Sequence, residues 1–164
     1  MTDMPQRNEA GLGQHDETVV ARILVVEDDA SVGAAIQIML ARHGCDTVLA
    51  ADGYAGLEAF KASAFAAVIV DIFMPGLNGL EVIKAFRQQS STIPILAICG
   101  LRFRDTMGSG LDFLGMAAKL GATACLRKPF TSQQLMAALT LSRDAARADG
   151  PSSGHREPEL AATR

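Results

Sequence analysis

Three short apolar segments of this 164-residue chain are each followed by charged side chains that could take part in phosphate or metal chemistry. Glu27, Asp28 and Asp29 follow RILVV, Asp71 follows AAVIV, and Lys128 follows a third apolar segment. Carboxylates held close together repel one another unless a cation joins them, and oxygen ligands favour a hard cation such as Mg²⁺. A carboxylate can attack phosphorus while a metal ion and an ammonium group neutralise the phosphoryl oxygens. These residues therefore predict a Mg²⁺ site at which an aspartate accepts a phosphoryl group.

Strand and helix signals alternate along the chain and would bring these residues to one edge of a sheet. The alternation of five β–α units predicts a doubly wound α/β fold, with helices on both faces of a parallel five-stranded sheet. In such a sheet, ligands bind beyond the carboxyl ends of the strands. The expected strands are 22–26, 45–50, 66–70, 94–98 and 122–127. Three of the expected helices are 30–43, 54–62 and about 111–120. A further helix begins at a capping box of Asn78 and Glu81, and the last begins at a capping box of Thr131 and Gln134 and runs to about 146.

Composition and charge place this sheet in one globular domain between two polar tails. The chain is 49% hydrophobic with a net charge of -3, which excludes a disordered chain, a collagen or a coiled coil. No apolar run approaches the ~20 residues that span a bilayer, and no secretory signal is evident, so we expect a cytoplasmic location without a membrane partner. Residues 21–143 hold 11 bases and 10 acids, which gives no basis for a nucleic-acid partner. The predicted organisation is a flexible leader at 1–20, a domain at 21–147 and a disordered tail at 148–164.

Three motifs give the chain a resemblance to a known family. VVEDD (25–29), VDIFMPGLNG (70–79) and RKPF (127–130) occur in this order at the ends of expected strands. Together they resemble the receiver domain of two-component response regulators, over roughly residues 21–143, and the chain resembles the single-domain type. The resemblance implies a flavodoxin-like strand order of 2-1-3-4-5 and a phosphoacceptor switch rather than an enzyme. It also implies a cis peptide bond before the proline of RKPF.

The resemblance assigns a role to each residue of the expected site. Asp71 matches the phosphoacceptor, and Lys128 matches the lysine that pairs with the phosphoryl group. Asp28, Asp71 and the main-chain carbonyl of Phe73 match direct ligands of Mg²⁺. Glu27 matches an acidic neighbour that acts on the metal ion through water.

Two cysteines and one segment depart from the family's pattern. Cys99 stands where the family has a Thr or Ser hydroxyl that binds the phosphoryl group, and a thiol is a weak donor. Cys125 stands where an aromatic ring switches between two positions. The segment 100–110 is longer than in most receivers, and its Arg102 and Arg104 could replace the missing switch or serve partner choice alone. A regulatory disulfide between Cys99 and Cys125 is conceivable, although buried free thiols are commoner in a reducing compartment.

The predicted function is that of a stand-alone receiver. The resemblance implies a sensor histidine kinase or a histidine phosphotransfer protein as donor. It also implies a downstream protein bound to the face formed by the fourth helix, fifth strand and fifth helix. Phe73 and Leu101 are bulky and apolar at positions near the phosphoryl group, so slow self-dephosphorylation is expected.

Simpler or different functions compete with this prediction. The two cysteine departures raise the alternative of a pseudo-receiver, a constitutive interaction module that is never phosphorylated, but the intact acidic group, Asp71 and Lys128 argue against it. A Mg²⁺-dependent phosphohydrolase would need a second aspartate at the position of Phe73, which argues against it. The acidic run could also be a solvated loop in which Asp29 caps the next helix.

Overall fold

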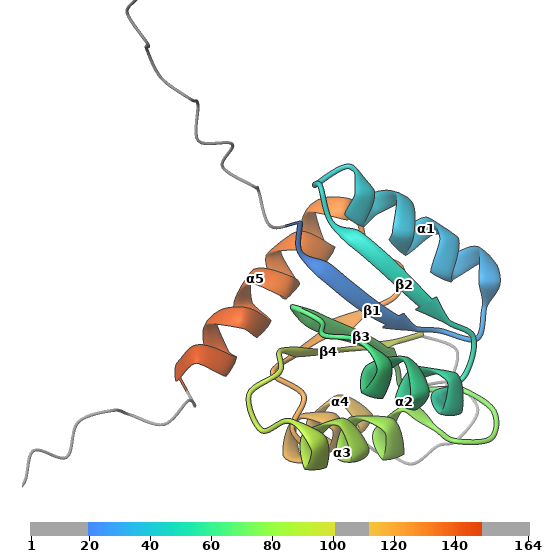
Figure 1. The fold of residues 1–164 in the computed structure, drawn as a ribbon, viewed down its shortest axis with the longest axis vertical. Coiled ribbons are helices and arrows are strands. Elements are labelled where there is room, and N and C mark those ends of the chain that lie inside the picture. The colour runs from blue at the N-terminus through green and yellow to red at the C-terminus, as the bar shows by residue number, and fades with distance from the viewer. Residues whose placement is uncertain (1–19, 101–111, 149–164) are drawn as a thin grey trace, which may run out of the picture.

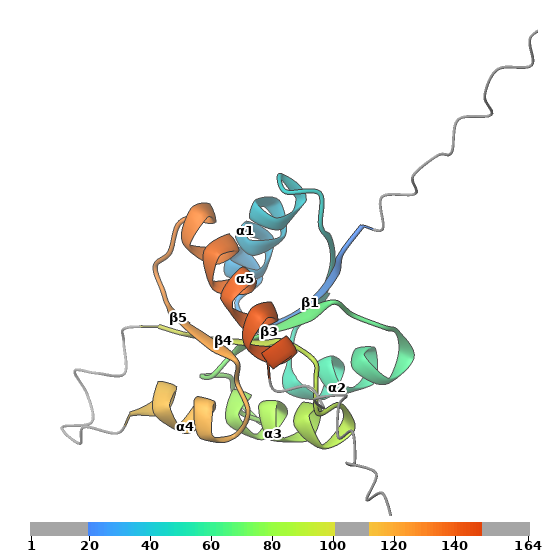
Figure 2. The same ribbon diagram turned by 90° about the vertical axis from the view of Figure 1, so that its left-hand side faces the viewer.

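The computed structural model of this chain describes residues 20–100 and 112–148. Five parallel strands form one sheet in the order β2-β1-β3-β4-β5, which confirms the predicted doubly wound, flavodoxin-like α/β fold. Helices α1 and α5 cover one face of the sheet, and α2, α3 and α4 cover the other (Figures 1 and 2). The strands are β1 (Arg22–Val26), β2 (Asp46–Ala50), β3 (Ala67–Asp71), β4 (Ile95–Cys99) and β5 (Ala124–Arg127); the helices are α1 (Ala30–Ala41), α2 (Gly53–Ala62), α3 (Gly79–Gln89), α4 (Phe113–Lys119) and α5 (Ser132–Ala148).

The three central strands are buried on both faces, as their continuous apolar sequences predicted. Every residue of β3 and β4, and all but the first residue of β1, is buried. Side chains that alternate along these strands feed two separate core layers. One layer packs Val26, Val70 and Phe86 beneath α2 and α3, and the other packs Val25 and Ile36 beneath α1 and α5. The sheet is therefore anchored on both sides, which fixes the edge where the strands end.

The helices begin and end close to the predicted residues, and capping side chains mark several of these ends. Asn78 and Glu81 form the predicted capping box at the start of α3. Thr131 and Gln134 exchange the corresponding bonds ahead of α5, with Thr131 N donating to Gln134 Oε1 at 2.8 Å. Helix α1 ends at Ala41 rather than near residue 43, and Gly44 adopts a φ of 72° in the turn that follows.

Two strands reach further than expected, which brings their last residues onto the sheet. Asp71 and Cys99 are the last residues of β3 and β4, whereas the sequence placed them directly after those strands. Ile72 N then donates to Ile98 O at 2.9 Å, so the ladder continues just past Asp71. Because Asp71 belongs to a buried strand, its backbone is held by the sheet and not by a free loop.

The turn after β3 is tight, and a glycine makes it possible. Gly79 N donates to Ile72 O at 3.0 Å, which closes the loop from β3 to the first residue of α3. A Cβ atom at this position would overlap the carbonyl oxygen of Asp71 and the Cα atom of Ile72. Only glycine fits this close approach of two backbones.

Several sequence predictions lie on residues outside the described ranges. The predicted leader and tail fall on residues 1–19 and 149–164, apart from one residue of each. The roles predicted for Leu101, Arg102 and Arg104 fall on residues 101–111. Among the helices of the described residues, none has the length and apolar character needed to cross a bilayer.

Candidate functional site

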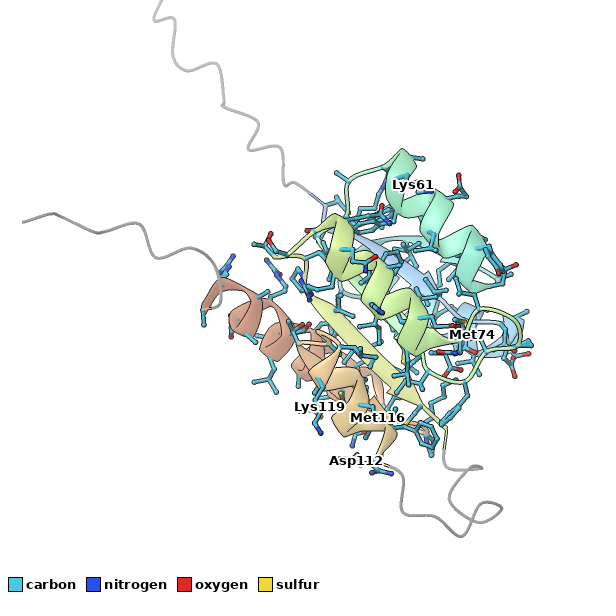
Figure 3. All side chains as sticks on the ribbon, turned by 90° about the horizontal axis from the view of Figure 1, so that it is seen from below. Lys61, Met74, Asp112, Met116 and Lys119 are labelled. Carbon is cyan, nitrogen blue, oxygen red and sulfur yellow. The ribbon has the colours of Figure 1, made fainter. Side chains whose placement is uncertain are left out.

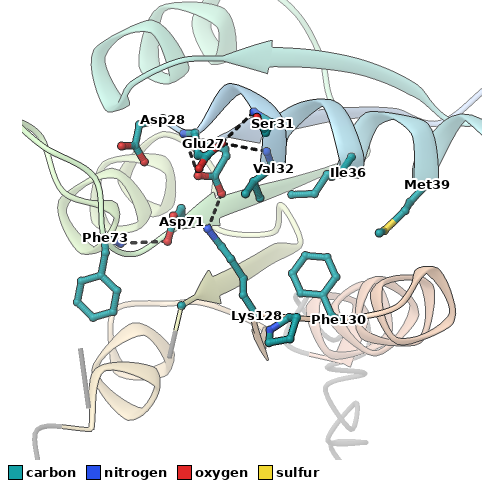
Figure 4. A pocket seen from close by; sticks show the side chains of 14 residues that line it. Glu27, Asp28, Ser31, Val32, Ile36, Met39, Asp71, Phe73, Lys128 and Phe130 are labelled. Atoms are coloured by element: carbon teal, nitrogen blue, oxygen red, sulfur yellow. Dashed lines mark hydrogen bonds and ion pairs between the residues drawn. The ribbon is translucent and has the colours of Figure 1, made fainter. Parts of the chain in front are cut away.

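Three carboxylates meet at the carboxyl edge of the sheet (Figure 4). Glu27 and Asp28 follow β1, and Asp71 ends the neighbouring strand β3, whose Val70 lies in register with Val26. One ligand oxygen from each of Glu27, Asp28 and Asp71 lies within 4.8 Å of the others. Glu27 and Asp71 are only 5% and 4% exposed, whereas Asp28 is exposed at the rim. The sequence predicted this convergence, because neighbouring parallel strands end at the same edge.

Lys128 inserts an ammonium group between two of these carboxylates. Its Nζ donates to Glu27 Oε2 and to Asp71 Oδ2, each at 2.7 Å. Lys128 N donates to Cys99 O at 2.8 Å, and the bond from Lys128 to Pro129 is cis, as the resemblance implied. The side chain is thus fixed at both ends above the end of the sheet.

The two partners of this lysine are electrostatically linked to it. Burial lowers the pKa of Lys128, but the hydrogen bonds and charges of Asp71 and Glu27 outweigh this, so the pKa lies above its ordinary value of 10.5. Burial raises the pKa of Glu27 above 4.5, against the opposing effect of its bond to Lys128. The arrangement therefore keeps a charged amine beside Asp71, where a second cation would relieve the remaining repulsion.

The remaining oxygens of Glu27 and Asp71 accept bonds from main-chain amides. Asp29 N donates to Glu27 Oε1 at 3.1 Å, and Phe73 N donates to Asp71 Oδ1 at 3.1 Å. Both carboxylates are therefore oriented by donors on two sides. That the carbonyl of Phe73 holds a metal ion stays a prediction.

Asp29 is not part of the cluster, which corrects the predicted convergence of all three consecutive acids. Its Oδ1 accepts from Ser31 N at 2.9 Å and from Val32 N at 3.2 Å, so it caps α1. For Asp29, but not for Glu27 or Asp28, the alternative prediction of a helix cap was correct. A cap satisfies orphan amides of the first helical turn, and that demand is local to α1.

The carboxylates open into a cavity of about 760 Å³ that continues along α1 (Figure 4). One end holds the acids and Lys128, and the other end is apolar. The apolar wall comes from α1 and from the turn before α5, with Val32, Ala35, Ile36, Met39, Pro129 and Phe130 as its lining. We call this apolar part of the cavity the trough. The sequence did not predict it, because the helical spacing of Val32, Ile36 and Met39 is equally typical of side chains buried in a core.

Cys99 and Cys125, the two cysteines that depart from the family's pattern, lie on neighbouring strands, as expected. Cys99 pairs with Arg127 and Cys125 pairs with Ala97, so the two cysteines are two residues out of register. Adjacent strands lie about 4.8 Å apart and two residues rise about 6.6 Å, which separates their Cα atoms by about 8 Å. A disulfide needs less than about 7 Å, and all three cysteines are free. Burial raises the pKa of both thiols.

Comparison with known proteins identifies the family. A family model described as the response regulator receiver domain matches residues 23–140. The chain belongs to this family. It is 36% identical over 120 residues to the transcriptional regulatory protein DltR of Streptococcus agalactiae, which covers 73% of this chain and 50% of DltR. It is 33% identical over 120 residues to the transcriptional regulatory protein FixJ of Bradyrhizobium diazoefficiens, with 73% and 55% covered. This receiver chain spans about half the length of those relatives.

Solved receiver structures have the same fold. The chemotaxis response regulator CheY4 of Vibrio cholerae superposes with a TM-score of 0.65 at 30% identity, over 75% of this chain and 98% of CheY4. A receiver domain protein of Clostridium thermocellum gives 0.68 at 26% identity, over 79% and 98%. Members of this family are phosphoacceptor switches in two-component systems rather than classical enzymes, bind Mg²⁺ in an acidic pocket and interact with histidine kinases or phosphotransfer proteins. This chain has an acidic cluster of Glu27, Asp28 and Asp71 at the carboxyl edge of its sheet.

Proposed function

We propose that this receiver accepts a phosphoryl group on Asp71, in a Mg²⁺-dependent reaction, from a sensor histidine kinase or a histidine phosphotransfer protein. The observation that carries the proposal is the position of Lys128 Nζ, 2.7 Å from both Asp71 Oδ2 and Glu27 Oε2. An ammonium group held there can neutralise a phosphoryl group placed on Asp71. The same group could not do so from a freely moving surface side chain.

The donor set fits a hard divalent cation. Its side-chain ligands are all oxygens, and three carboxylates share one small region with the amine of Lys128. We assign Asp28, Asp71 and the Phe73 carbonyl as direct ligands and Glu27 as a ligand through water. Bound there, Mg²⁺ would offset negative charge on the transferring phosphoryl oxygens.

The chain's own residues perform the rest of the transfer. A carboxylate oxygen of Asp71 forms the new bond to phosphorus while the phosphorus–nitrogen bond of the donor's phosphohistidine breaks. The departing imidazole nitrogen keeps the electron pair of that bond. Lys128 then moves from pairing with the free carboxylate to pairing with the phosphoryl oxygens, and Glu27 continues to hold the amine in place.

The apolar trough supports an approach of the donor along α1. Met39 and Phe130 face each other across it, and the acids lie at its end (Figure 4). An amphipathic helix that carries the phosphohistidine would bury apolar side chains in the trough and present its phosphoryl group to Asp71. Replacing Met39 by Lys is expected to slow transfer from the donor while leaving reaction with a small phosphodonor unchanged.

We further propose that residues 21–147 act as one cytoplasmic unit that signals by protein contact, without nucleic acid or membrane. The downstream face would include α4 and α5, where Met116 and Leu141 are 41% and 65% exposed. Figure 3 shows Met116 and Lys119 along the outer side of α4. Exposed apolar side chains on such a face are the usual centre of a protein contact.

Intact-mass spectrometry with Mg²⁺ and a small-molecule phosphodonor tests the proposed function. The wild type should gain one phosphoryl group, and Asp71→Asn should gain none. Asp52→Asn is the matched control, because Asp52 caps α2 and is not a member of the cluster, and asparagine caps equally well. An adduct on Asp71→Asn, or none on the wild type when Mg²⁺ binding is confirmed separately, would contradict it. The second result would favour the pseudo-receiver that Cys99 and Cys125 suggest.

A further inference from the structure

One residue of the site contacts both the expected phosphoacceptor and a helix on the downstream face. The main-chain amide of Phe73 donates to Asp71 Oδ1 at 3.1 Å. Its ring points away from the carboxylate (Figure 4) and meets the ring of Phe113 edge to face, with centroids 4.9 Å apart and planes at 76°. Phe113 is the first residue of α4. Phe73 therefore joins the acceptor to the start of that helix.

A second contact holds the same helical turn. Cys125 Sγ lies 3.6 Å from Leu114 O and donates to it, and Leu114 follows Phe113 in α4. The first turn of α4 thus contacts the loop after β3 through an aromatic pair and β5 through a thiol. At this position of β5 a cysteine has no ring to move between two positions, whereas the acceptor loop does supply an aromatic contact to α4.

We propose that the Phe73–Phe113 pair transmits the phosphorylation state of Asp71 to α4, an inference that rests on the proposed function. Phosphorylation changes the charge and position of the oxygen that accepts from Phe73 N, so the loop after β3 must adjust. An edge-to-face pair has a narrow range of favourable geometry, and its loss shifts a two-state equilibrium by about threefold to tenfold. Movement of Phe73 therefore weakens or strengthens the ring contact that stabilises the first turn of α4. Phe113 acts as a positioning residue for this output.

Hydrogen exchange of α4 tests the proposal directly. The rate is compared before and after phosphorylation in the wild type, Phe113→Leu and Phe113→Tyr, with the phosphorylated fraction measured by intact mass. We expect a severalfold change in the wild type, loss of most of that change in Phe113→Leu, and its return in Phe113→Tyr. Because each variant is compared with its own unmodified form, mere destabilisation of α4 does not imitate this result.

A control substitution and three outcomes separate this inference from the proposed function. Phe65→Leu alters another aromatic pair, Phe60–Phe65 at 6.4 Å, and should leave the change in α4 intact. If the wild type gains no phosphoryl group, the proposed function fails and the inference fails with it. If it gains one but α4 does not change, or if Phe113→Leu keeps the full change, only the inference is overturned.

Discussion

The acceptor cluster and the neighbouring strands β4 and β5 differ in how completely they match the receiver pattern. The cluster holds all four side chains that the resemblance assigns to it, with Lys128 bridging Glu27 and Asp71 and with Asp28 beside them. Cys99 is the last residue of β4 and Cys125 the second residue of β5, at positions where the resemblance implies a hydroxyl and an aromatic ring. We therefore treat accepting a phosphoryl group and reporting it as separable requirements, and propose that this chain meets the second with different side chains.

The largest effect is expected from removing the amine of Lys128 from the cluster, which tests whether the cluster serves phosphorylation. Lys128→Met should slow phosphorylation of Asp71 by about 100-fold, because a preorganised charge beside the reacting oxygens is lost. Lys128→Arg is the control that keeps the charge while changing its shape. The measurement is the rate of adduct formation by intact mass. A Met variant that reacts as fast as the wild type would show that the bridge is structural alone.

The lifetime of the phosphoryl group tests the apolar character of the acceptor loop. Phe73→Asn should shorten that lifetime by about tenfold, because an amide can orient the attacking water and a phenyl ring cannot. Decay of the adduct over hours gives the rate. Phe73→Leu is the matched control, since it stays apolar, and a decay of Phe73→Asn no faster than that of Phe73→Leu would refute the expectation.

The repulsion within the cluster should be visible in stability. Without Mg²⁺, Asp28→Asn should raise the free energy of unfolding by about 1 kcal/mol, because it removes one of three crowded carboxylates. Added Mg²⁺ at about ten times its Kd should stabilise the wild type by about 1.4 kcal/mol and the variant far less. Urea unfolding with and without Mg²⁺ measures both. Equal stabilisation of the two proteins would exclude Asp28 as a ligand.

The last expected effect, no larger than that of Asp28→Asn, comes from restoring a hydroxyl at the end of β4. Cys99→Thr should strengthen the phosphorylation-dependent change in α4 exchange by about fivefold, the equivalent of one net hydrogen bond of about 1 kcal/mol. Cys99→Val, of similar shape without the hydroxyl, is the control. A threonine variant that behaves like the valine variant would mean that the strand end has no part in the output.

The central sheet and the acid cluster were predictable because both follow from sequence-local rules. Apolar runs such as 23–26 and 67–70 define strands buried on both faces, and parallel strands end at one edge, which brings Asp71 beside Glu27. Asp29 was ambiguous, because the same position serves a metal cluster or a helix cap. Only the backbone path of α1 decides between them.

The contacts that cross between loops were not predictable. Phe73 and Phe113 are 40 positions apart, and no periodicity relates an acceptor loop to the first turn of a later helix. The trough has the same origin, since Met39 and Phe130 come from elements whose packing angle the sequence does not state. Periodicity tells which face a side chain takes, and not which distant side chain it meets.

The order of the strands has a consequence for how the molecule is made on the ribosome. After β1 and β2 have paired, β3 adds to β1, β4 adds to β3 and β5 adds to β4, so each emerging strand finds a partner that has already been synthesised. The acids of the cluster emerge with β1 and β3, whereas Lys128 follows β5. The negative charges are therefore synthesised before their counterion, and pairing of β1 with β3 ahead of Lys128 would depend on dissolved cations.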